Sequence, residues 1–536
     1  MANTPLKGKV PTRNSVKSAS LPAPIQGLNT RDPFENMDPT YAVSVSNFIA
    51  TPQGLSVRQG YTSNVTGITG YVQSLLVYKG NTTASDRLFA CAGTQMYDAT
   101  LASSTPAVVQ AGLTSSLWEH TNATTNGGRY MVACNGVDPA RFYDGTTWTN
   151  FSFNATPSVP GQITTGSMAS LTNWKLPIIH QRRIWITQKN STVAYYLPVD
   201  SMGGVATSFD FGPTFSRGGS IATMQSWSVD LGIGIQQYLV VVSTSGDVVI
   251  YTGNNPAVAT SWALAGSWRL GEPIGIRCLY PYQSDLLYLS QDGCMELSKY
   301  LKSTRVENTS ALSLTIQPTI SDLVGTFGTL PGFEMISYPG SNVMILNVPQ
   351  VNADQNFQFV YNTITQGWTQ FTGWGAQCWA MLNNNLYFGG NGMVANAFVG
   401  YRDGANSDLT GGSSYYAYVQ QAFNYFDSRG QNKRFIMARP NLSTAVATPL
   451  FAASCNVDFD LSVPAANIST PAPRSGTWDH SIFDSSTWGF GGQSFNQWQS
   501  TSGIGYCASL AIVISVNDYT LWASTDWVYE PGGIIG

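Results

Sequence analysis

The residue types that most often carry catalysis or bind metals are few and scattered in this sequence. Its three histidines, His120, His180 and His480, lie far apart, and no HExxH or other paired histidine spacing occurs. Zinc ligands normally come at such spacings, so satisfied structural histidines are the better interpretation. The nucleophile elbow GxSxG and the phosphate loop GxxxxGK[ST] are both missing. The sequence therefore predicts that the chain is not an enzyme and holds no metal or other cofactor.

Two short segments place an acidic or amide side chain a few residues before a tryptophan. Tyr143-Asp-Gly-Thr-Thr-Trp148 is similar to the Asp-box of sialidases, but its aspartate directly precedes the glycine, which breaks that motif's spacing. Tyr361-Asn-Thr-Ile-Thr-Gln-Gly-Trp368 is similar to the strand ends of kelch-like blades. A turn closed by Asp or Asn, followed by a packing tryptophan, explains both segments more simply than catalysis. We therefore expect Trp148, Trp262 and Trp368 to be buried anchors between sheets.

One basic cluster stands out within residues 428–440, where no acidic residue interrupts it; its members are Arg429, Lys433, Arg434 and Arg439. Three interpretations are open. The cluster is a solvated hairpin face, a subunit contact to the acidic C-terminal region, or part of a positive ring facing DNA phosphates. We expect mainly subunit contacts, with a minority of the four facing a DNA channel.

The elements that must position these groups are short apolar strands. Between Arg87 and Phe398 a strand, a Gly or Asn/Asp turn and a second strand ending in Tyr or Trp recur about every 40 to 55 residues. Such a repeat is typical of radial β arrays, in which no unit hides its faces alone. We predict an all-β protein with a β-propeller of about six or seven blades. A long β-sandwich or two stacked β-domains is the alternative.

Composition shifts divide the chain into four predicted parts. Residues 1–40 are proline-rich and form an extended N-terminal arm, and residues 41–78 form a first β unit that joins a platform. Residues 79–400 form the propeller, and residues 401–536 form a C-terminal β-rich platform domain. We find no helix of ordinary length. The arm is expected to dock on a neighbouring subunit or on the ring above it, and the docking candidates are its basic residues, Lys7, Lys9, Arg13 and Lys17.

Composition also bounds the class of protein. Charged residues make up only 10% of the 536 residues and the net charge is -4. Few charges leave a surface poorly protected against association, which predicts burial in an assembly. Seven cysteines without a CxxC pair indicate reduced core residues of a protein made in a reducing cytosol. No signal peptide or membrane-spanning run is expected.

Both ends of the chain carry a family resemblance. Pro24-Ile-Gln-Gly-Leu-Asn-Thr-Arg-Asp-Pro33 and Gly54-Leu-Ser-Val-Arg-Gln-Gly-Tyr61 resemble the opening of tail proteins from short-tailed bacteriophages. The family is that of the tail nozzle, or tail tubular protein B-like, proteins. The ending Asp526-Trp-Val-Tyr-Glu-Pro-Gly-Gly533 is similar to the C-termini of the same group.

The resemblance implies a structural protein of the virion tail, assembled in the bacterial host cytoplasm. It implies a homohexameric tube below the adaptor (head-to-tail connector) ring, with β-propellers around an inner platform. Further implied partners are a tail fibre or tailspike protein and, transiently, the genomic DNA that the tube conducts. Two other classes stay open: a receptor-binding propeller that recognises host glycan, and a propeller glycosidase.

Overall fold

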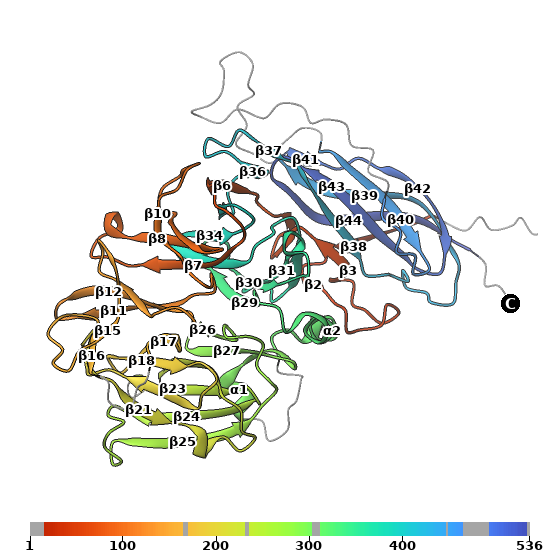
Figure 1. Cartoon of the computed structure of the whole chain (residues 1–536). Coiled ribbons are helices and arrows are strands. Elements are labelled where there is room, and N and C mark those ends of the chain that lie inside the picture. The colour runs from red at the N-terminus through yellow and green to blue at the C-terminus, as the bar shows by residue number, and fades with distance from the viewer. Residues whose placement is uncertain are drawn as a thin grey trace, which may run out of the picture. The chain divides into compact units, whose positions relative to one another are not determined.

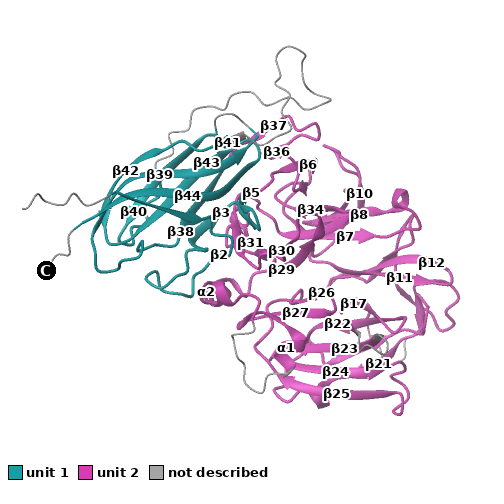
Figure 2. Cartoon of the chain, turned by 180° about the vertical axis from the view of Figure 1, so that it is seen from behind, with its two compact units in different colours: residues 1–57, 416–536 teal, residues 58–415 magenta. Residues whose placement is uncertain are grey.

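Short β-branched and aromatic segments form strands along the whole chain, which fall into two compact units. The computed structural model describes residues 16–164, 170–230, 235–302, 311–445, 449–464 and 493–532. Residues 1–57 and 416–536 form the platform unit, and residues 58–415 form the propeller unit (Figure 2). Both ends of the chain thus build the platform unit, and the propeller unit is one continuous insertion between them.

The propeller unit consists of consecutive antiparallel sheets (Figure 1). Within the described residues four of these sheets have four strands and one has three, and two further sets of four strands are parts of larger sheets. The first strand of each sheet is its innermost strand, and these strands are β7 (Val72–Tyr78), β11 (Glu119–Thr125), β17 (Trp174–His180), β22 (Ile221–Asp230), β26 (Leu279–Tyr282), β29 (Glu334–Tyr338) and β33 (Cys378–Leu382). A cavity of about 410 Å³ is lined by residues from all seven, so the inner strands surround one axis. This radial arrangement confirms the predicted β-propeller.

The outer strands follow in chain order within each sheet. They are β8 (Arg87–Ala92), β9 (Gln95–Asp98) and β10 (Val108–Ala111); β12 (Gly128–Cys134), β13 (Arg141–Tyr143) and β14 (Trp148–Asn150); β18 (Arg183–Gln188), β19 (Val193–Tyr196) and β21 (Thr207–Asp210); β23 (Ile235–Ser243), β24 (Asp247–Gly253) and β25 (Trp262–Arg269); β27 (Asp285–Ser290) and β28 (Gly293–Glu296); β30 (Val343–Val348), β31 (Phe357–Asn362) and β32 (Trp368–Phe371); β34 (Asn385–Gly389) and β35 (Val394–Ala397). A small parallel sheet joins β15 (Ser152–Phe153) and β16 (Gln162–Thr164), which follow β14 in sequence, to β20 (Gly204–Val205), which falls between β19 and β21.

The last sheet is completed by a strand from the start of the unit. β6 (Tyr61–Val65) pairs antiparallel with β35, so the two ends of the propeller segment meet in one sheet. This differs from the predicted boundaries, which placed residues 58–78 outside the propeller and residues 401–415 in the platform domain. Sequence spacing does not reveal ring closure, because the pairing joins strands more than 300 residues apart.

Helix is sparse but not absent. α1 (Leu297–Lys302) and α2 (Gln317–Phe327) lie between β28 and β29. α2 has eleven residues, so the expectation of no ordinary helix was wrong. Its apolar residues recur at helical spacing, with Ile320 and Val324 buried, but its N-cap is Ile316, which offers no capping oxygen. The weak start signal explains why the segment was missed.

The platform unit contains two sets of paired strands. One set joins β1 (Lys17–Pro22), β4 (Phe48–Thr51), β5 (Gly54–Val57), β39 (Lys433–Thr444), β41 (Gln493–Phe495), β42 (Gln499–Gly505) and β44 (Thr520–Pro531). The other joins β2 (Gly27–Leu28), β3 (Tyr41–Ser46), β38 (Tyr415–Gln421), β40 (Phe451–Val457) and β43 (Ala508–Val516). All nine residues of β43 are buried, which marks it as a core strand.

The β4–β5 hairpin depends on a glycine. Gly54 has φ +148°, and a Cβ at this position would lie 2.2 Å from the carbonyl oxygen of Trp522 on β44. Only glycine permits this backbone approach. The residue therefore fixes how β5 meets β44.

The predicted arm is partly integrated into the platform unit. β1 pairs antiparallel with β44, with Lys17 opposite Tyr529 and Pro22 opposite Ser524. Residues 17–22 are thus ordered by the chain's own C-terminal strand, which corrects the expectation that a neighbouring subunit orders them. Lys7, Lys9 and Arg13 lie outside the described residues.

Candidate functional site

A buried ionic cluster lies on the propeller axis, where the loop before β26 carries Arg277 between two glutamates. Its Nε donates to Glu119 Oε1 at 2.8 Å and its Nη1 donates to Glu334 Oε2 at 3.1 Å. The three side chains are only 16 to 18% exposed. Arg277 Nη2 also donates to Ser74 Oγ and to the carbonyl oxygen of Trp118. The guanidinium of Arg277 therefore hydrogen-bonds residues of three inner strands, β7, β11 and β29, from the loop that precedes a fourth, β26.

Burial and the neighbouring charges shift the pKa values of this cluster in opposite directions. Burial alone would lower the pKa of Arg277, but Glu119 and Glu334 outweigh it and hold the pKa above its ordinary value. Burial raises the pKa of Glu334, and Arg277 opposes that rise. A guanidinium with two carboxylates satisfies most of its donors, which is the condition under which a buried charge is tolerated.

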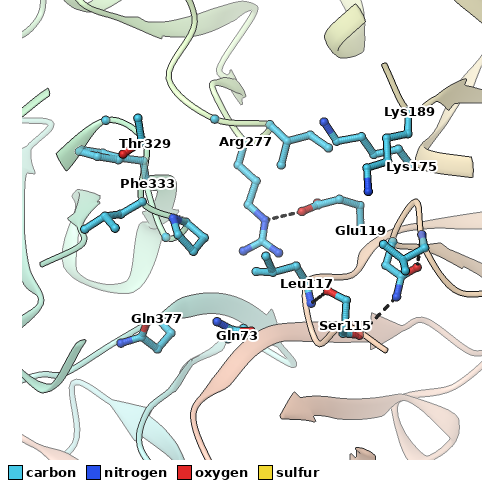
Figure 3. Close-up of a pocket in the computed structure, with 18 residues that line it drawn as sticks. Gln73, Ser115, Leu117, Glu119, Lys175, Lys189, Arg277, Thr329, Phe333 and Gln377 are labelled. Carbon is cyan, nitrogen blue, oxygen red and sulfur yellow. Dashed lines mark hydrogen bonds and ion pairs between the residues drawn. The ribbon is translucent and has the colours of Figure 1, made fainter. Parts of the chain in front are cut away.

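The cluster separates two hollows along the axis. Arg277 and Glu119 line both the inner cavity and a second pocket of about 440 Å³. Figure 3 shows the second pocket, with Lys175 and Lys189 on one side, Thr329 and Phe333 on the other, and the Arg277–Glu119 pair between them. This pocket, formed wholly by the propeller unit, is called the axial pocket below.

The axial cluster has a sequence signal that differs from the catalytic and metal-binding motifs considered above. In three blades an aromatic residue is followed by a charged one at the start of the innermost strand. These dipeptides are Trp118-Glu119, Trp174-Lys175 and Phe333-Glu334. The aromatic ring is buried in each case, and the charged side chain that follows it lines one of the two axial hollows. The pairing of these groups with Arg277 still requires the ring to be closed.

Of the two described histidines His180 is buried and His120 is half-buried, and each has a hydrogen-bond partner. His120 Nε2 accepts a hydrogen bond from the backbone N–H of Val77, and His180 Nδ1 lies 3.0 Å from Ser226 Oγ. Burial lowers the pKa of both imidazoles to about 4. His480 lies outside the described residues. Among the described residues no group of three or more His, Cys, Asp or Glu side chains is placed to hold a metal ion.

The predicted turn-and-anchor segments have the expected local structure. Asp144 Oδ1 accepts hydrogen bonds from the backbone N–H groups of Thr146 and Thr147, which closes the turn. Trp368 is fully buried and Trp262 is 7% exposed. Trp148 is only partly buried, packed 5.1 Å from the ring of Phe89. Two of the three anchors are therefore confirmed as buried, and the third lies at a blade edge.

Three members of the basic cluster make contacts within their own chain. Arg429 donates to the carbonyl oxygen of Glu35 and to Asn36, and Arg439 pairs with Asp526 at 2.7 Å. Lys433 is 1% exposed, and its ammonium donates to three backbone carbonyl oxygens. We expected an acidic partner from another subunit, but Arg439 finds its acidic partner, Asp526, in the same chain.

Arg434 differs from the other three members of the basic cluster. It is exposed, and its guanidinium has no hydrogen bond or ion pair with any described residue. Lys17, of the N-terminal set, is also exposed, at the start of β1. Arg434 is therefore the member of the cluster whose charge is free for another molecule.

All seven cysteine thiols are free, and six are buried, as the sequence indicated. Burial raises the pKa of the thiols of Cys91, Cys134, Cys278, Cys294 and Cys378, which makes the reactive thiolate scarce at neutral pH. In the described part of the chain, no helix is long and apolar enough to cross a membrane.

Comparison with known protein sequences identifies no family. Neither a protein-family model nor a curated protein sequence matches the chain. Among solved structures, the β-propeller domain of Myceliophteria thermophila Cps50 (Swd1) is similar over 63% of this chain and 99% of that one, with 12% identity and a TM-score of 0.37. Raptor from Chaetomium thermophilum is similar over 64% of this chain, with 9% identity and a TM-score of 0.35. The chain spans only 28% of the length of Raptor.

Proposed function

We propose that this chain is a structural subunit of the tail nozzle of a short-tailed bacteriophage, assembled in the host cytoplasm and not an enzyme. The observation that carries the proposal is the division of the chain. Residues 58–415 form a propeller inserted into a β-rich platform that both chain ends build. A platform that bears one propeller per subunit is the organisation that the sequence resemblance implies for the nozzle family. The platform is then the part that assembles into the tube.

The platform unit exposes side chains suited to an interface between subunits. Ile504 is 66% exposed on β42, directly opposite Arg434 on β39, and Met437 is 38% exposed on β39. Interfaces combine exposed apolar groups with arginine more often than with lysine. In the proposed homohexamer this surface contacts the next subunit, and the adaptor ring and a tail fibre or tailspike protein bind elsewhere on the ring.

The axial carboxylates favour this proposal over a glycosidase. Hydrolysis of a glycosidic bond needs one carboxyl group as acid and another as base or nucleophile. Glu119 and Glu334 both face the axis, but Arg277 lies between them and hydrogen-bonds each one. Carboxylates paired with an arginine in this way stabilise the fold and are poorly suited to act as the acid and base of a hydrolase.

A glycan-binding propeller of a phage tail is the second candidate. It is favoured by Trp498, a 39% exposed aromatic side chain of the platform unit, because indole rings stack on sugars. However, the guanidinium of Arg439 lies 4.8 Å from the ring centroid of Trp498. One face of the indole is therefore already covered.

Native mass spectrometry of the purified full-length chain tests the proposal. A nozzle subunit is expected to give a closed oligomer of six copies, about 350 kDa from the 57.8 kDa chain. A monomer at all concentrations, combined with selective binding on a glycan array, would instead support the receptor-binding candidate. Turnover of a bacterial surface polysaccharide, abolished by Glu119→Gln or Glu334→Gln in a folded variant, would support the glycosidase.

A further inference from the structure

The axial pocket contains two lysines that form no salt bridge with a described residue, although Glu119 of the same pocket favours the charge of Lys175. Lys175 and Lys189 lie together on one wall (Figure 3). Neither ammonium has a hydrogen bond or ion pair with any described residue. This contrasts with Arg277 on the same pocket, which is held by two glutamates.

The backbone conformation around β17 and β18 fixes the positions of these two lysines. The register of β17 against β18 shifts between Trp174 and Leu176, so Lys175 is the extra residue of a β-bulge. Bulges redirect a side chain and are common beside binding sites. Lys189 follows β18 directly, and its backbone N–H donates to the carbonyl oxygen of Asn173 at 2.8 Å. The two lysines are therefore anchored to the same pair of strands.

A glycine lets the two stems lie side by side. A Cβ on Gly136 would lie 3.3 Å from Cδ of Lys189 and 3.5 Å from Cβ of Lys175. Its φ of +73° also disfavours other residues. Gly136 is fixed in turn by a hydrogen bond of 2.7 Å from its N–H to the carbonyl oxygen of Trp174. The side chains of Lys175 and Lys189 therefore both pack against the Gly136 backbone and enter the pocket from the same side.

Three other polar side chains of the pocket already have hydrogen-bond partners. Gln73 accepts a hydrogen bond from Ser116, Asn135 donates to Asp138, and Gln377 donates to the carbonyl oxygen of Ala353. Burial lowers the pKa of Lys175, Glu119 opposes that change and Lys189 adds to it. A negative charge in the pocket would relieve the repulsion between the two lysines.

The opposite wall is apolar apart from Thr329. It is formed by Leu330, Pro331 and Phe333, and the rim carries Leu117 and Val137, which are 40% and 39% exposed. A volume of about 440 Å³ lies in the range of small-molecule sites. We propose that the axial pocket binds a small organic anion, a carboxylate or phosphate ester whose charge lies between Lys175 and Lys189 and whose body lies against the apolar wall.

Isothermal titration of the full-length protein with three matched sugars tests the proposal. Glucose 6-phosphate and glucuronate carry the charge on a common body, and neutral glucose does not. We expect one or both anions to bind and glucose not to bind. The anion that binds more tightly identifies the ester or the carboxylate as the preferred group. Equal affinity for all three sugars, or binding of none, would overturn the proposal.

Two variants locate the site. Lys189→Gln changes an exposed residue and leaves folding intact, and is expected to weaken anion binding by roughly tenfold or more, the loss typical of one charged hydrogen bond. Lys299→Gln, on the exposed face of α1, removes the same charge outside the pocket and is expected to change nothing. Inorganic phosphate alone is expected to bind at least tenfold more weakly than glucose 6-phosphate. If Lys189→Gln and Lys299→Gln behave alike, the anion binds elsewhere and the proposal is wrong.

Discussion

Arg277 Nε donates to Glu119 Oε1 at 2.8 Å across the propeller axis, joining the loop before β26 to the inner strand β11. A second bond to Glu334 extends this link to β29. These strands begin 158 and 57 residues away from Arg277 in the chain. A ring of small sheets has no single hydrophobic core. The ion pairs of Arg277 at its centre are therefore one place where distant blades stabilise each other.

The first prediction concerns this arginine. Arg277→Met is expected to lower the free energy of unfolding by roughly 3–5 kcal/mol, because two buried carboxylates then face each other without a cation. Urea denaturation measures the change. The matched control is Arg182→Met, which breaks the pair with Asp200 where the arginine side chain is 75% exposed, and is expected to cost about 1 kcal/mol or less. Similar losses in both variants would show that the axial cluster has no special role.

The second prediction compares two tryptophans. Trp262 of β25 stacks on Tyr251 at 5.5 Å and on Trp185 of the neighbouring blade at 5.7 Å. Trp262→Ala is expected to cost about 3–5 kcal/mol because it leaves a cavity between blades. Trp148→Ala is expected to cost clearly less, because that indole is only half-buried. Thermal and urea unfolding of both variants decide this, and an equal or larger cost at Trp148 would contradict the blade packing described above.

The third prediction concerns pH. His180 is 1% exposed and its folded-state pKa is lowered to about 4, whereas an unfolded histidine titrates near 6.5. Because the unfolded state then binds more protons, stability falls as the pH drops from about 6.5 to about 4, by roughly 1.4 kcal/mol per pH unit. Above that window the group is neutral in both states and contributes no pH dependence.

His180→Phe isolates this contribution. The variant keeps a ring beside Trp262 but cannot be protonated, so its stability is expected to fall less steeply between pH 6.5 and pH 4.5 than that of the parent. His120 remains in both proteins and its effect cancels in the comparison. Parallel pH profiles of parent and variant would mean that His180 is protonated in the folded protein.

The fourth prediction concerns Arg434. Reversal to Glu is expected to impair oligomer formation while costing the monomer about 1 kcal/mol or less. The side chain is exposed and makes no hydrogen bond or ion pair with a described residue, but the reversed charge would lie opposite Glu530 on β44. Raising the salt concentration is expected to weaken the parent oligomer in the same direction. Sedimentation velocity measures both effects. Asp322→Asn on α2, which alters an exposed charge of the propeller unit, serves as control; normal assembly of Arg434→Glu would remove this residue from the interface.

The strand repeat was predictable because it depends on local pattern. Segments such as Arg87–Ala92 and Val343–Val348 are apolar on both faces and end at turn residues, and they form strands β8 and β30. The closure of the ring by β6, the pairing of β1 with β44 and the boundary at residue 58 could not be predicted in this way, because each joins segments from distant parts of the chain.

The candidate site was less predictable than the fold. A search for short motifs passes over Arg277, because a single arginine before an apolar strand has no distinctive spacing. Its importance comes from the two glutamates that other blades place beside it. The basic cluster at 429–439, which spacing did reveal, is engaged for the most part in contacts within the platform unit.

Electron microscopy of the purified full-length protein tests the central claim most directly. A nozzle subunit is expected to give ring-shaped particles whose class averages show six-fold symmetry around an open central bore, with one propeller per repeat. Single propeller-sized particles without rotational symmetry, seen under conditions where the protein is folded, would contradict the assignment of this chain to a tail tube.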